Sequence, residues 1–470
     1  MSAVIESRDI PVSWQLVPLK ELGVWSGGGT PSKAKPEFWT NGSIPWVSPK
    51  DMKVERITDS EDHITKVAVE ESTAKLIPEG SVLVVTRSGI LSHTLPVAVT
   101  AVPVTVNQDL KAITPKDGVL PEYVAWALRC FAREILNTCS KQGTTVASIE
   151  TAALHRFEIP LAPLDQQKRI VAEIEKQFSR LDEAVANLKR VKANLKRYKA
   201  AVLKAAVEGR LVETEAELAR REGRSYEPAN ELLSKVEPTQ TLKKRAGRLW
   251  GSGHVPALTE EERAHLPEGW YWVKVRDIGY SPEDAVQVGP MSMRSSEFTP
   301  AGVPVLNVGC VKWGYFDETK LDHLPVNLAA HFERYRIQPG DVLFTRSGTV
   351  GRCAVAKDYQ RDWLMTFHLL RARPDSAKCL PEYLRAVFEG ASHIRRQTRE
   401  ASIGSTRAGF NTNLLAMLDV PLAPMAEQRR IMAEVDRRLS ILRETEAQVD
   451  ANLQRAEHLR QSILEDAYAG

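Results

Sequence analysis

The sequence predicts two copies of a globular α/β (α+β) domain, joined by two long helices that form an antiparallel coiled coil. Three observations predict this fold class: a long internal repeat, short β-branched runs mixed with helical patterns inside each copy, and a seven-residue apolar stripe after each copy. With 470 residues the chain is too long for one compact core, since a domain takes roughly 150 residues. We therefore expect an internal pseudo-two-fold repeat.

The repeat is clearest near the end of each half. EIPLAPLDQQKRIVAEIEKQ from Glu158 returns as DVPLAPMAEQRRIMAEVDRR from Asp419, and 419 minus 158 gives an offset of 261. TRSG at Thr86 returns at Thr345, and LPEY also occurs in both halves. A period this long exceeds solenoid units of roughly 20 to 50 residues, so a whole domain and its following helix are duplicated.

Each copy mixes strand and helix patterns. GSVLVVTRSG and GDVLFTRSG are short β-branched runs that end in glycine, while LPEYVAWALRCFAREIL has helical apolar spacing after an early proline. The predicted segments are a first domain at 1–163, a long central helix at 164–209, a linker with short helices at 210–267, a second domain at 268–424 and a C-terminal helix at 425–470.

The end of each copy carries an apolar residue at every seventh position, which is typical of a coiled-coil helix. A stripe sustained over about five heptads needs a partner helix, and the nearest candidate is the other copy. We expect the helix of about 164–209 to pair antiparallel with that of about 425–469; packing of each helix on its own domain is the alternative. The predicted spacer positions are Ile174, Leu181, Leu188, Leu195, Val202, Val435, Leu442, Val449 and Ile463.

Signatures of catalysis and metal binding are missing from the sequence. It has no Walker A motif, no HExxH and no GxSxG, and its five cysteines form no CxxC pair. No apolar run approaches the roughly 18 residues of a membrane span, and the N-terminus lacks a basic-then-apolar leader pattern. We predict a cytoplasmic, non-catalytic chain with no metal, no cofactor of its own and no membrane partner.

The remaining polar motifs indicate recognition. TRSG places an arginine between hydroxyl residues where an apolar strand ends, and such a group donates to phosphate oxygens or, through arginine, to a guanine edge. A strand-ending turn whose arginine pairs with a carboxylate is the alternative. Segments of small and hydroxyl-bearing residues at 142–145 and 404–407 are suited to close approach to a DNA backbone. Capping of the following secondary-structure element explains these segments equally well. The candidate DNA contacts are Arg87, Ser88, Thr144, Thr145, Arg346, Ser347, Thr406 and Arg407.

Further motifs accompany these: a GGTPS opening with PEFW, then NGSIPWVSPKDM, IPEGSVLVVTRSG, VNQDLKAI and IPLAPLDQQKRIVAEI, with weaker second versions LPEGW, VPVLNVG, VLFTRSG and VPLAPMAEQRRIMAEV. Together they resemble the specificity (S) subunit of type I restriction-modification systems over nearly the whole chain. The resemblance implies two target-recognition domains that each read half of a split double-stranded DNA site, with the helices fixing their separation. It also implies two modification subunits that carry S-adenosylmethionine, and restriction subunits that use ATP and Mg.

The second copy departs from the first at several motifs. It lacks the GGTPS and PEFW opening and has MTFHLLRA in place of VNQDLKA, which sets Asn107 opposite Phe367 and Gln108 opposite His368. We therefore expect the copies to read different half-sites. The competing classes are a self-sufficient nuclease or methyltransferase, which needs catalytic residues that the sequence lacks, and a structural coiled-coil adaptor, which does not need two large diverged domains.

Overall fold

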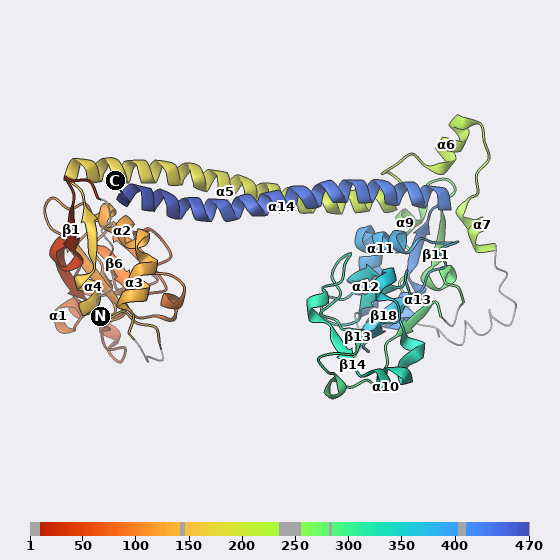
Figure 1. Cartoon of the computed structure of the whole chain (residues 1–470), viewed down its shortest axis with the longest axis horizontal. Helices are drawn as coiled ribbons and strands as arrows, with labels where there is room; N and C mark the ends of the chain where they lie inside the picture. Colours follow the sequence, from red (N-terminus) through yellow and green to blue (C-terminus); the bar gives the residue numbers. More distant parts are fainter. Residues whose placement is uncertain (1–9, 142–145, 235–254, 282–283, 403–409, 470) are drawn as a thin grey trace. The chain divides into compact units, whose positions relative to one another are not determined.

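The computed structural model describes residues 10–141, 146–234, 255–281, 284–402 and 410–469. The chain divides into two compact units. Unit 1 comprises Met1–Arg190 and Val449–Gly470, and unit 2 comprises Val191–Gln448. Each unit holds one globular domain together with part of each long helix (Figure 1).

Unit 1 is built around short, mostly apolar strands. They are β1 (Gln15–Pro18), β2 (Gly23–Gly27), β3 (Ile44–Val47), β4 (Arg56–Ile57), β5 (Asp62–Ile64), β6 (Val82–Val85), β7 (Val97–Thr100), β8 (Thr105–Val106), β9 (Leu110–Pro115) and β10 (Glu158–Leu161). The main sheet has the order β2-β9-β6-β7-β4, and a smaller sheet has the order β5-β3-β8. Every residue of β6 is buried, as its unbroken VLVV run predicts for a strand that is covered on both faces.

Helices cover the main sheet of unit 1. The helices and 3₁₀ turns are η1 (Leu19–Leu22), η2 (Pro36–Phe38), α1 (Lys66–Glu71), η3 (Gly89–Ser92), α2 (Pro121–Cys130), α3 (Ala132–Cys139) and α4 (Thr151–Arg156). Helix α2 begins with a proline in its first turn, where no backbone donor is lost. Most of its residues are buried in the same core as β6, so α2 and the sheet share one hydrophobic core.

Unit 2 repeats this topology except for β4, which has no counterpart in the main sheet of unit 2 as described. Its strands are β11 (Tyr271–Lys274), β12 (Val286–Val288), β13 (Val303–Leu306), β14 (Asp322–Leu324), β15 (Val342–Thr345), β16 (Cys353–Val355), β17 (Leu364–Met365), β18 (Leu369–Ala372) and β19 (Asp419–Leu422). The order β12-β18-β15-β16 matches β2-β9-β6-β7, and β14-β13-β17 matches β5-β3-β8. The terminal pair β11-β19 likewise matches β1-β10.

Short helices complete unit 2. They are α6 (Glu215–Glu222), α7 (Ala229–Ser234), α9 (Glu260–Ala264), η4 (Val275–Ile278), η5 (Ser295–Glu297), η6 (Glu318–Lys320), α10 (Val326–Ala329), η7 (Ala330–Tyr335), η8 (Asp358–Gln360), α11 (Pro381–Gly390), α12 (Ser392–Ser402) and α13 (Thr412–Met417). Helix α6 begins with a capping box in which Thr214 and Glu217 bond each other's backbone N–H groups. Among the described helices, none combines the length and apolarity that a membrane crossing needs.

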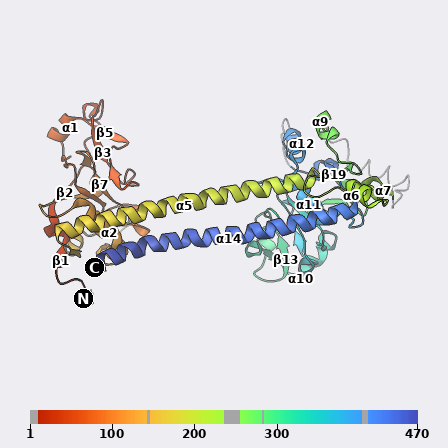
Figure 2. The same cartoon turned by 90° about the horizontal axis from the view of Figure 1, so that it is seen from above.

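The long helices are α5 (Leu164–Val207) and α14 (Met425–Ala469). In unit 1, Phe178 near the start of α5 shares a core with Tyr468 near the end of α14. In unit 2, Ala206 near the end of α5 shares a core with Val435 near the start of α14. The helices therefore run in opposite directions within each unit (Figure 2), and the predicted antiparallel pairing is confirmed. Both helices also join the cores of the domains beside them, so the two packing modes coexist.

Burial along the predicted spacer positions is uneven. Ile174, Val202, Val435, Leu442 and Val449 are buried, whereas Leu181, Leu188, Leu195 and Ile463 are half-buried. Ile174, Val202 and Val435 also belong to the domain cores, which add to the cover that the helix pair gives them. Leu442 and Val449 are buried without belonging to either of these cores.

The repeated LPEY and LAP motifs join each domain to its long helix. In unit 1, Tyr123 donates its hydroxyl hydrogen to the Pro160 carbonyl at 2.8 Å, and the Gln167 side chain accepts from Leu120 N–H at 2.8 Å. In unit 2, Tyr383 donates to Pro421 at 2.7 Å, and Gln428 accepts from Leu380 N–H at 2.9 Å. The same bonds thus fix the start of α5 and the start of α14.

Candidate nucleic-acid interface

Three motifs of the first domain meet at one end of its main sheet. Strands β2 and β6 end there and β9 begins there, because β9 is antiparallel to both. The last ladder pairs are Gly27 with Lys111 and Val85 with Leu110. The GGGT loop after β2, the TRSG loop after β6 and the NQD residues before β9 are therefore neighbours.

Arg87 of the TRSG loop faces a carboxylate. Its Nε lies 3.1 Å from Oδ1 of Asp109, and the Asp109 carbonyl accepts the Thr86 and Arg87 N–H groups at 2.7 and 3.2 Å. The arginine side chain nevertheless keeps 62% of its surface exposed, against 19% for Asp109. The carboxylate pairing predicted as an alternative is therefore present, and it leaves most of the guanidinium available to a ligand.

Ser88 shapes the same loop. Its hydroxyl caps η3 by accepting from Ile90 N–H, and its own N–H donates to the Ala147 carbonyl at 3.0 Å. Thr144 and Thr145 lie outside the described residues. The segments on either side of them are placed, since Lys141 N–H donates to Ser148 and Ile149 N–H donates to Thr86, both at 2.8 Å. This connection therefore begins and ends beside the TRSG loop.

The NQD residues contribute two side chains that the sequence reasoning missed. Gln108 is exposed, and its Oε1 accepts from the Thr30 hydroxyl at 2.7 Å. Asp109 N–H donates to the Asn107 side chain at 3.0 Å, which closes a tight turn. The GGGT loop lies close against β8, because a Cβ at Gly28 would stand 1.8 Å from the Val106 carbonyl oxygen. A polar NQD triplet between two apolar runs was the signal available in the sequence.

The second domain holds its arginine differently. Arg346 N–H donates to the His368 carbonyl at 3.0 Å, and its guanidinium stacks over the Phe367 ring at 4.3 Å. Ser347 is exposed next to it. Thr406 and Arg407 lie outside the described residues. Arg346 and Ser347 follow β15 directly, while Arg87 and Ser88 follow β6 after Thr86, so both TRSG loops stand at the same end of their sheets.

The structure corrects the pairing of the two copies near this end. The first ladder bond here runs from Asn107 N–H to Val47, and its counterpart runs from Thr366 N–H to Leu306, both at 3.0 Å. Thr366, not Phe367, therefore takes the place of Asn107. Phe367 in turn takes the place of Gln108.

The reason lies in the strand register. Aligning the sequences KA and RA equates Ala112 with Ala372. In the structure, however, Ala112 pairs with Leu83 and Arg371 pairs with Leu343, the leucine that corresponds to Leu83 in the second copy. Arg371 is therefore the counterpart of Ala112. The two copies are therefore offset by one residue from the alignment of the letters. The expectation that Asn107 stands opposite Phe367 and Gln108 opposite His368 is wrong by one position.

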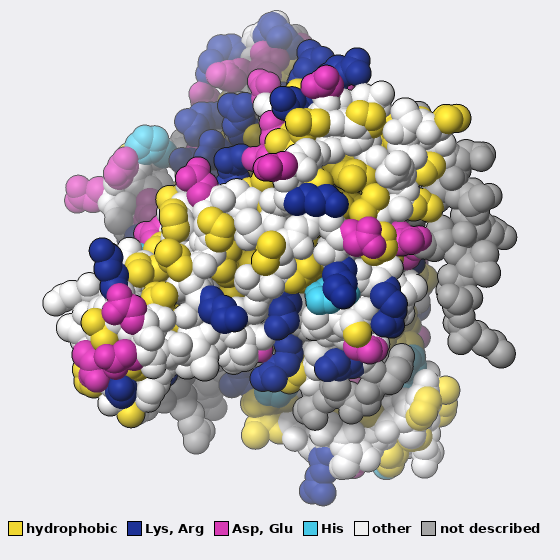
Figure 3. Space-filling view, turned by 90° about the vertical axis from the view of Figure 1, so that its left-hand side faces the viewer, with side chains coloured by type: hydrophobic (Ala, Val, Ile, Leu, Met, Phe, Trp, Pro, Cys, Tyr) yellow, Lys and Arg dark blue, Asp and Glu magenta, His cyan; other side chains and the backbone are white. Residues whose placement is uncertain are grey.

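Two lysines, Lys20 and Lys111, lie near His155 at the β2–β9 edge of unit 1. Burial and the charges of Lys20 and Lys111 lower the pKa of His155, whose ring packs on Trp25 with centroids 4.4 Å apart. The face of unit 1 seen in Figure 3 carries lysine and arginine side chains interspersed with apolar and acidic ones. Such a mixed surface supports phosphate contacts at individual lysines and arginines rather than through one uniformly basic patch.

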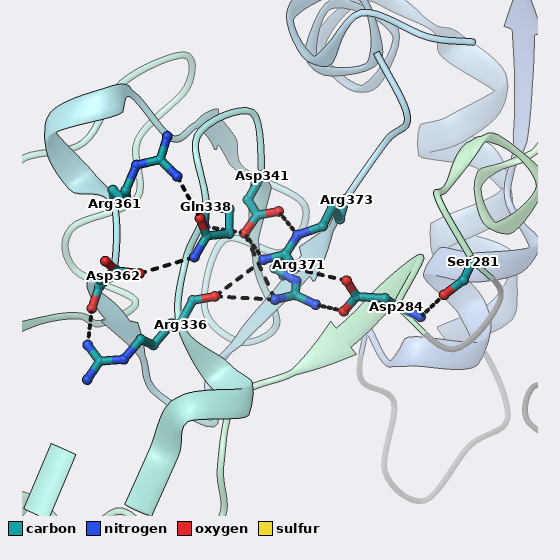
Figure 4. A network of polar contacts seen from close by, with 9 residues as sticks. All are labelled: Ser281, Asp284, Arg336, Gln338, Asp341, Arg361, Asp362, Arg371 and Arg373. Atoms are coloured by element: carbon teal, nitrogen blue, oxygen red, sulfur yellow. Dashed lines mark hydrogen bonds and ion pairs between the residues drawn. The ribbon is translucent and has the colours of Figure 1, made fainter. Parts of the chain in front are cut away.

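A second polar cluster lies at the opposite end of the unit 2 sheet (Figure 4). Arg373 binds Asp341 through two hydrogen bonds of 2.6 and 2.8 Å and binds Asp284 at 2.9 Å. Arg371, fully buried, pairs with the same two carboxylates, and burial lowers its pKa. Ser81 and Thr114 hold the corresponding place in unit 1, with their hydroxyls 2.9 Å apart. This cluster is far from the TRSG loop and ties strands together.

The described residues include no cluster of three or more His, Cys, Asp or Glu side chains that could hold a metal ion. The cysteines Cys130, Cys139, Cys310, Cys353 and Cys379 are buried and unbridged. Burial raises the pKa of the Cys353 thiol well above its usual range, so this sulfur stays protonated. The exposed polar groups at the sheet ends are therefore the candidate site.

Comparison with known proteins supports this assignment. The model of the type I restriction modification DNA specificity domain matches residues 11–197. The specificity subunit of the type I restriction enzyme EcoR124I/EcoR124II from Escherichia coli is 44% identical over 182 residues, which are 39% of this chain and 44% of that protein. The chain therefore aligns with less than half the length of that relative.

Solved structures share the fold over almost the whole chain. A chain from work on complex assembly and conformational transition of the type I R-M system has a TM-score of 0.67 at 18% identity, covering 98% of this chain and 99% of that one. The HsdS subunit from Thermoanaerobacter tengcongensis has a TM-score of 0.53 at 19% identity, covering 98% of each chain. The likeness thus extends to both units.

The first copy thus matches a type I restriction modification DNA specificity domain, and the second copy repeats its strand order and is likewise followed by a long helix. The resemblance to specificity (S) subunits that was drawn from the motifs is confirmed for the first copy, because residues 11–197 match the DNA specificity domain of this family.

Proposed function

We propose that the chain is the non-catalytic subunit that gives a type I restriction-modification complex its DNA specificity. Each domain reads one half of a bipartite, gapped site in double-stranded DNA. The observation that carries this proposal is the duplication itself: the copy that matches a DNA specificity domain is followed by a second copy with the same sheet order. Two similar readers on one chain suit a target of two half-sites.

The proposed reading surfaces are the loops at the TRSG end of each main sheet. In the first domain they present Arg87 and Gln108, and in the second they present Arg346 over Phe367. Different side chains at equivalent positions support different half-sites, because sequence is read through contacts to base edges. The proposal also includes four candidates that lie outside the described residues: Thr144, Thr145, Thr406 and Arg407.

The helices are proposed to set the distance between the half-sites and to dock two methyltransferase subunits. With 44 residues, α5 extends about 66 Å at 1.5 Å per residue, whereas one DNA turn is about 34 Å. Its length therefore suffices for a gapped site. In this proposal the methyltransferase subunits carry S-adenosylmethionine, restriction subunits use ATP and Mg, and the assembly works on DNA in the cytoplasm.

The deciding experiment is methylome sequencing of the native host with this gene intact and deleted. We expect one asymmetric, gapped methylation motif to disappear in the deletion strain and to return on complementation. An unchanged methylome, with active methyltransferase subunits present, contradicts the proposal. Methyl transfer by the purified chain alone would favour an enzyme, and failure to bind DNA alongside the methyltransferase would favour a structural adaptor.

A further inference from the structure

The first domain presents two exposed side chains, each held by a second residue. We propose that Arg87 and Gln108 read two nearby bases of the first half-site, a guanine and an adenine, with Asp109 and Thr30 as their positioning residues. This inference rests on the proposed function and deepens it, since it names the bases that one half-site contains.

Arg87 has the geometry of a guanine reader. Asp109 engages it from the Nε side at 3.1 Å, and within the described part of the chain no hydrogen bond occupies its terminal nitrogens. A guanidinium fixed from one side presents its free edge as a planar pair of donors. Guanine offers the matching pair of acceptors, N7 and O6, in the major groove. Arg87 therefore needs no rearrangement of its anchor to bind a guanine.

Asp109 is suited to positioning rather than to contact with DNA. Its Oδ1 is buried and accepts no hydrogen bond from the described residues, so the nearby Arg87 supplies its compensating charge. Its Oδ2 is 3.1 Å from the Asn107 amide nitrogen, which fixes the carboxylate. A carboxylate held in this way orients the guanidinium before DNA arrives, and preorganisation lowers the entropy that binding costs.

Gln108 has the complementary arrangement for adenine. The Thr30 hydroxyl donates to Oε1, which orients the amide and leaves one Oε1 lone pair and the Nε2 donor without a partner in the described structure. Adenine presents an N6 donor and an N7 acceptor, which a glutamine amide matches bidentately. Thr30 thus orients the Gln108 side chain, as Asp109 orients the Arg87 side chain.

The two readers are close enough to act on one half-site. The N–H of Arg87 bonds the carbonyl of Asp109, the residue after Gln108, so the two side chains start from neighbouring strand ends. Neighbouring strands are about 4.8 Å apart, while base pairs stack about 3.4 Å apart. Long side chains from these positions therefore reach adjacent or next-but-one base pairs.

The second domain lacks this pair. Phe367 takes the place of Gln108, and Arg346 stacks on its ring instead of facing a carboxylate. The inference accordingly applies to one half-site only, and the other half-site is an internal control in every measurement.

The test is DNA selection and sequencing with the complex of this chain and its methyltransferase subunits, giving base preferences at each position of both half-sites. Arg87→Ala should reduce the preference for one guanine about 10- to 100-fold while the other half-site is unchanged. Gln108→Ala should do the same to an adenine within two positions of that guanine.

Asp109→Asn tests positioning, because it keeps the shape but removes the charge facing Arg87. It should weaken the guanine preference less than Arg87→Ala does, at an unchanged melting temperature, and Asp109→Glu should restore part of it. Arg56→Ala is the matched control. Arg56 is 56% exposed and paired with Glu122, but it lies at the other end of the same sheet.

Each outcome decides between readings. Equal weakening of all sequences by Arg87→Ala, with a salt slope reduced by about one, would identify a phosphate contact and overturn the inference. A first half-site without guanine also overturns it. Absence of any selected motif in the wild-type complex would instead contradict the proposed function.

Loss of both half-sites in an Arg87→Ala protein with a lowered melting temperature would indicate a folding defect. Arg87→Lys then provides the test, because lysine keeps the charge: this variant should keep the affinity for DNA while losing the guanine preference.

Discussion

The junction between each domain and its long helix is the same in both units, whereas the reading ends of the two sheets differ. Gln167 and Gln428 make matching bonds, and so do Tyr123 and Tyr383. At the reading ends, an arginine facing a carboxylate in one unit is replaced by an arginine stacked on a ring in the other. The duplicated sequence is thus retained where each domain joins its long helix and changed at the proposed reading surfaces.

The interiors of the two sheets also differ in charge. Ser81 and Thr114 pair as neutral hydroxyls in unit 1, while Asp341 and Arg373 form an ion pair at the equivalent ladder position in unit 2. A buried ion pair is weak evidence for added stability, because desolvation offsets the attraction. Once present, however, its removal is costly. The two units therefore share one topology while depending on different interactions at this position.

The largest effect should come from breaking that ion pair. Asp341→Ala leaves the fully buried Arg371 and its neighbour Arg373 short of a carboxylate, and we expect unit 2 to lose about 3–5 kcal/mol of its free energy of unfolding. Ser81→Ala in unit 1 should cost about 1 kcal/mol. Hydrogen exchange resolved to peptides from β15 and β6 measures both, and equal effects would refute the distinction between the two interiors.

The next effect tests the shared junction. Gln167→Ala and Gln428→Ala each remove an amide that bonds three backbone groups, including Ala162 O at 2.8 Å and Ala423 O at 2.9 Å. We expect each to lower the free energy of unfolding of its own unit by about 2–4 kcal/mol, because buried backbone groups lose their partners. Thermal melting, combined with hydrogen exchange resolved to peptides of each unit, compares the two variants. A cost confined to one unit would show that the junctions are not equivalent.

The sequence predicted the parts of the fold that rest on periodicity and repetition. The heptads at Ile174 and Val435 predicted that the two long helices pair, and the repeated TRSG predicted two equivalent loops. The register at the reading end could not be predicted, since matching Ala112 with Ala372 looked better than the true offset. Asp109 and Gln108 were missed as candidate site residues because only the strand order brings them beside Arg87.

A smaller effect concerns pH and again separates the units. Burial lowers the pKa of His393, whose Nε2 donates to the Asp419 carbonyl at 2.9 Å, and burial also lowers that of half-buried His155. Both imidazoles fold in the neutral form, so stability is complete above an unfolded pKa of about 6.5 and falls as the pH drops toward the folded values. Unit 2 should lose more, because His393 is the more deeply buried.

Melting curves between pH 5 and pH 8 check this expectation, with His393→Gln as the matched variant. Glutamine keeps an N–H donor for the Asp419 carbonyl but does not titrate in this range. Its melting temperature should therefore vary less with pH than that of the wild type, and an unaltered pH profile would assign the acid sensitivity to other groups.

The smallest effect should come from the surface of the helix pair in unit 1. Arg460 bonds Asp182 and lies over the Phe178 ring at 4.6 Å, but the arginine and aspartate side chains keep 37% and 61% of their surface exposed. Asp182→Asn should lower the free energy of unfolding by at most about 1 kcal/mol, since water and salt screen exposed pairs. Arg460→Ala should cost slightly more because it also removes the ring contact. Chemical denaturation at low and high salt distinguishes the ion pair from the ring contact. The effect of Asp182→Asn should become smaller as the salt concentration rises. A large loss that does not depend on salt would mean that this pair, rather than the apolar seam, holds the helices together.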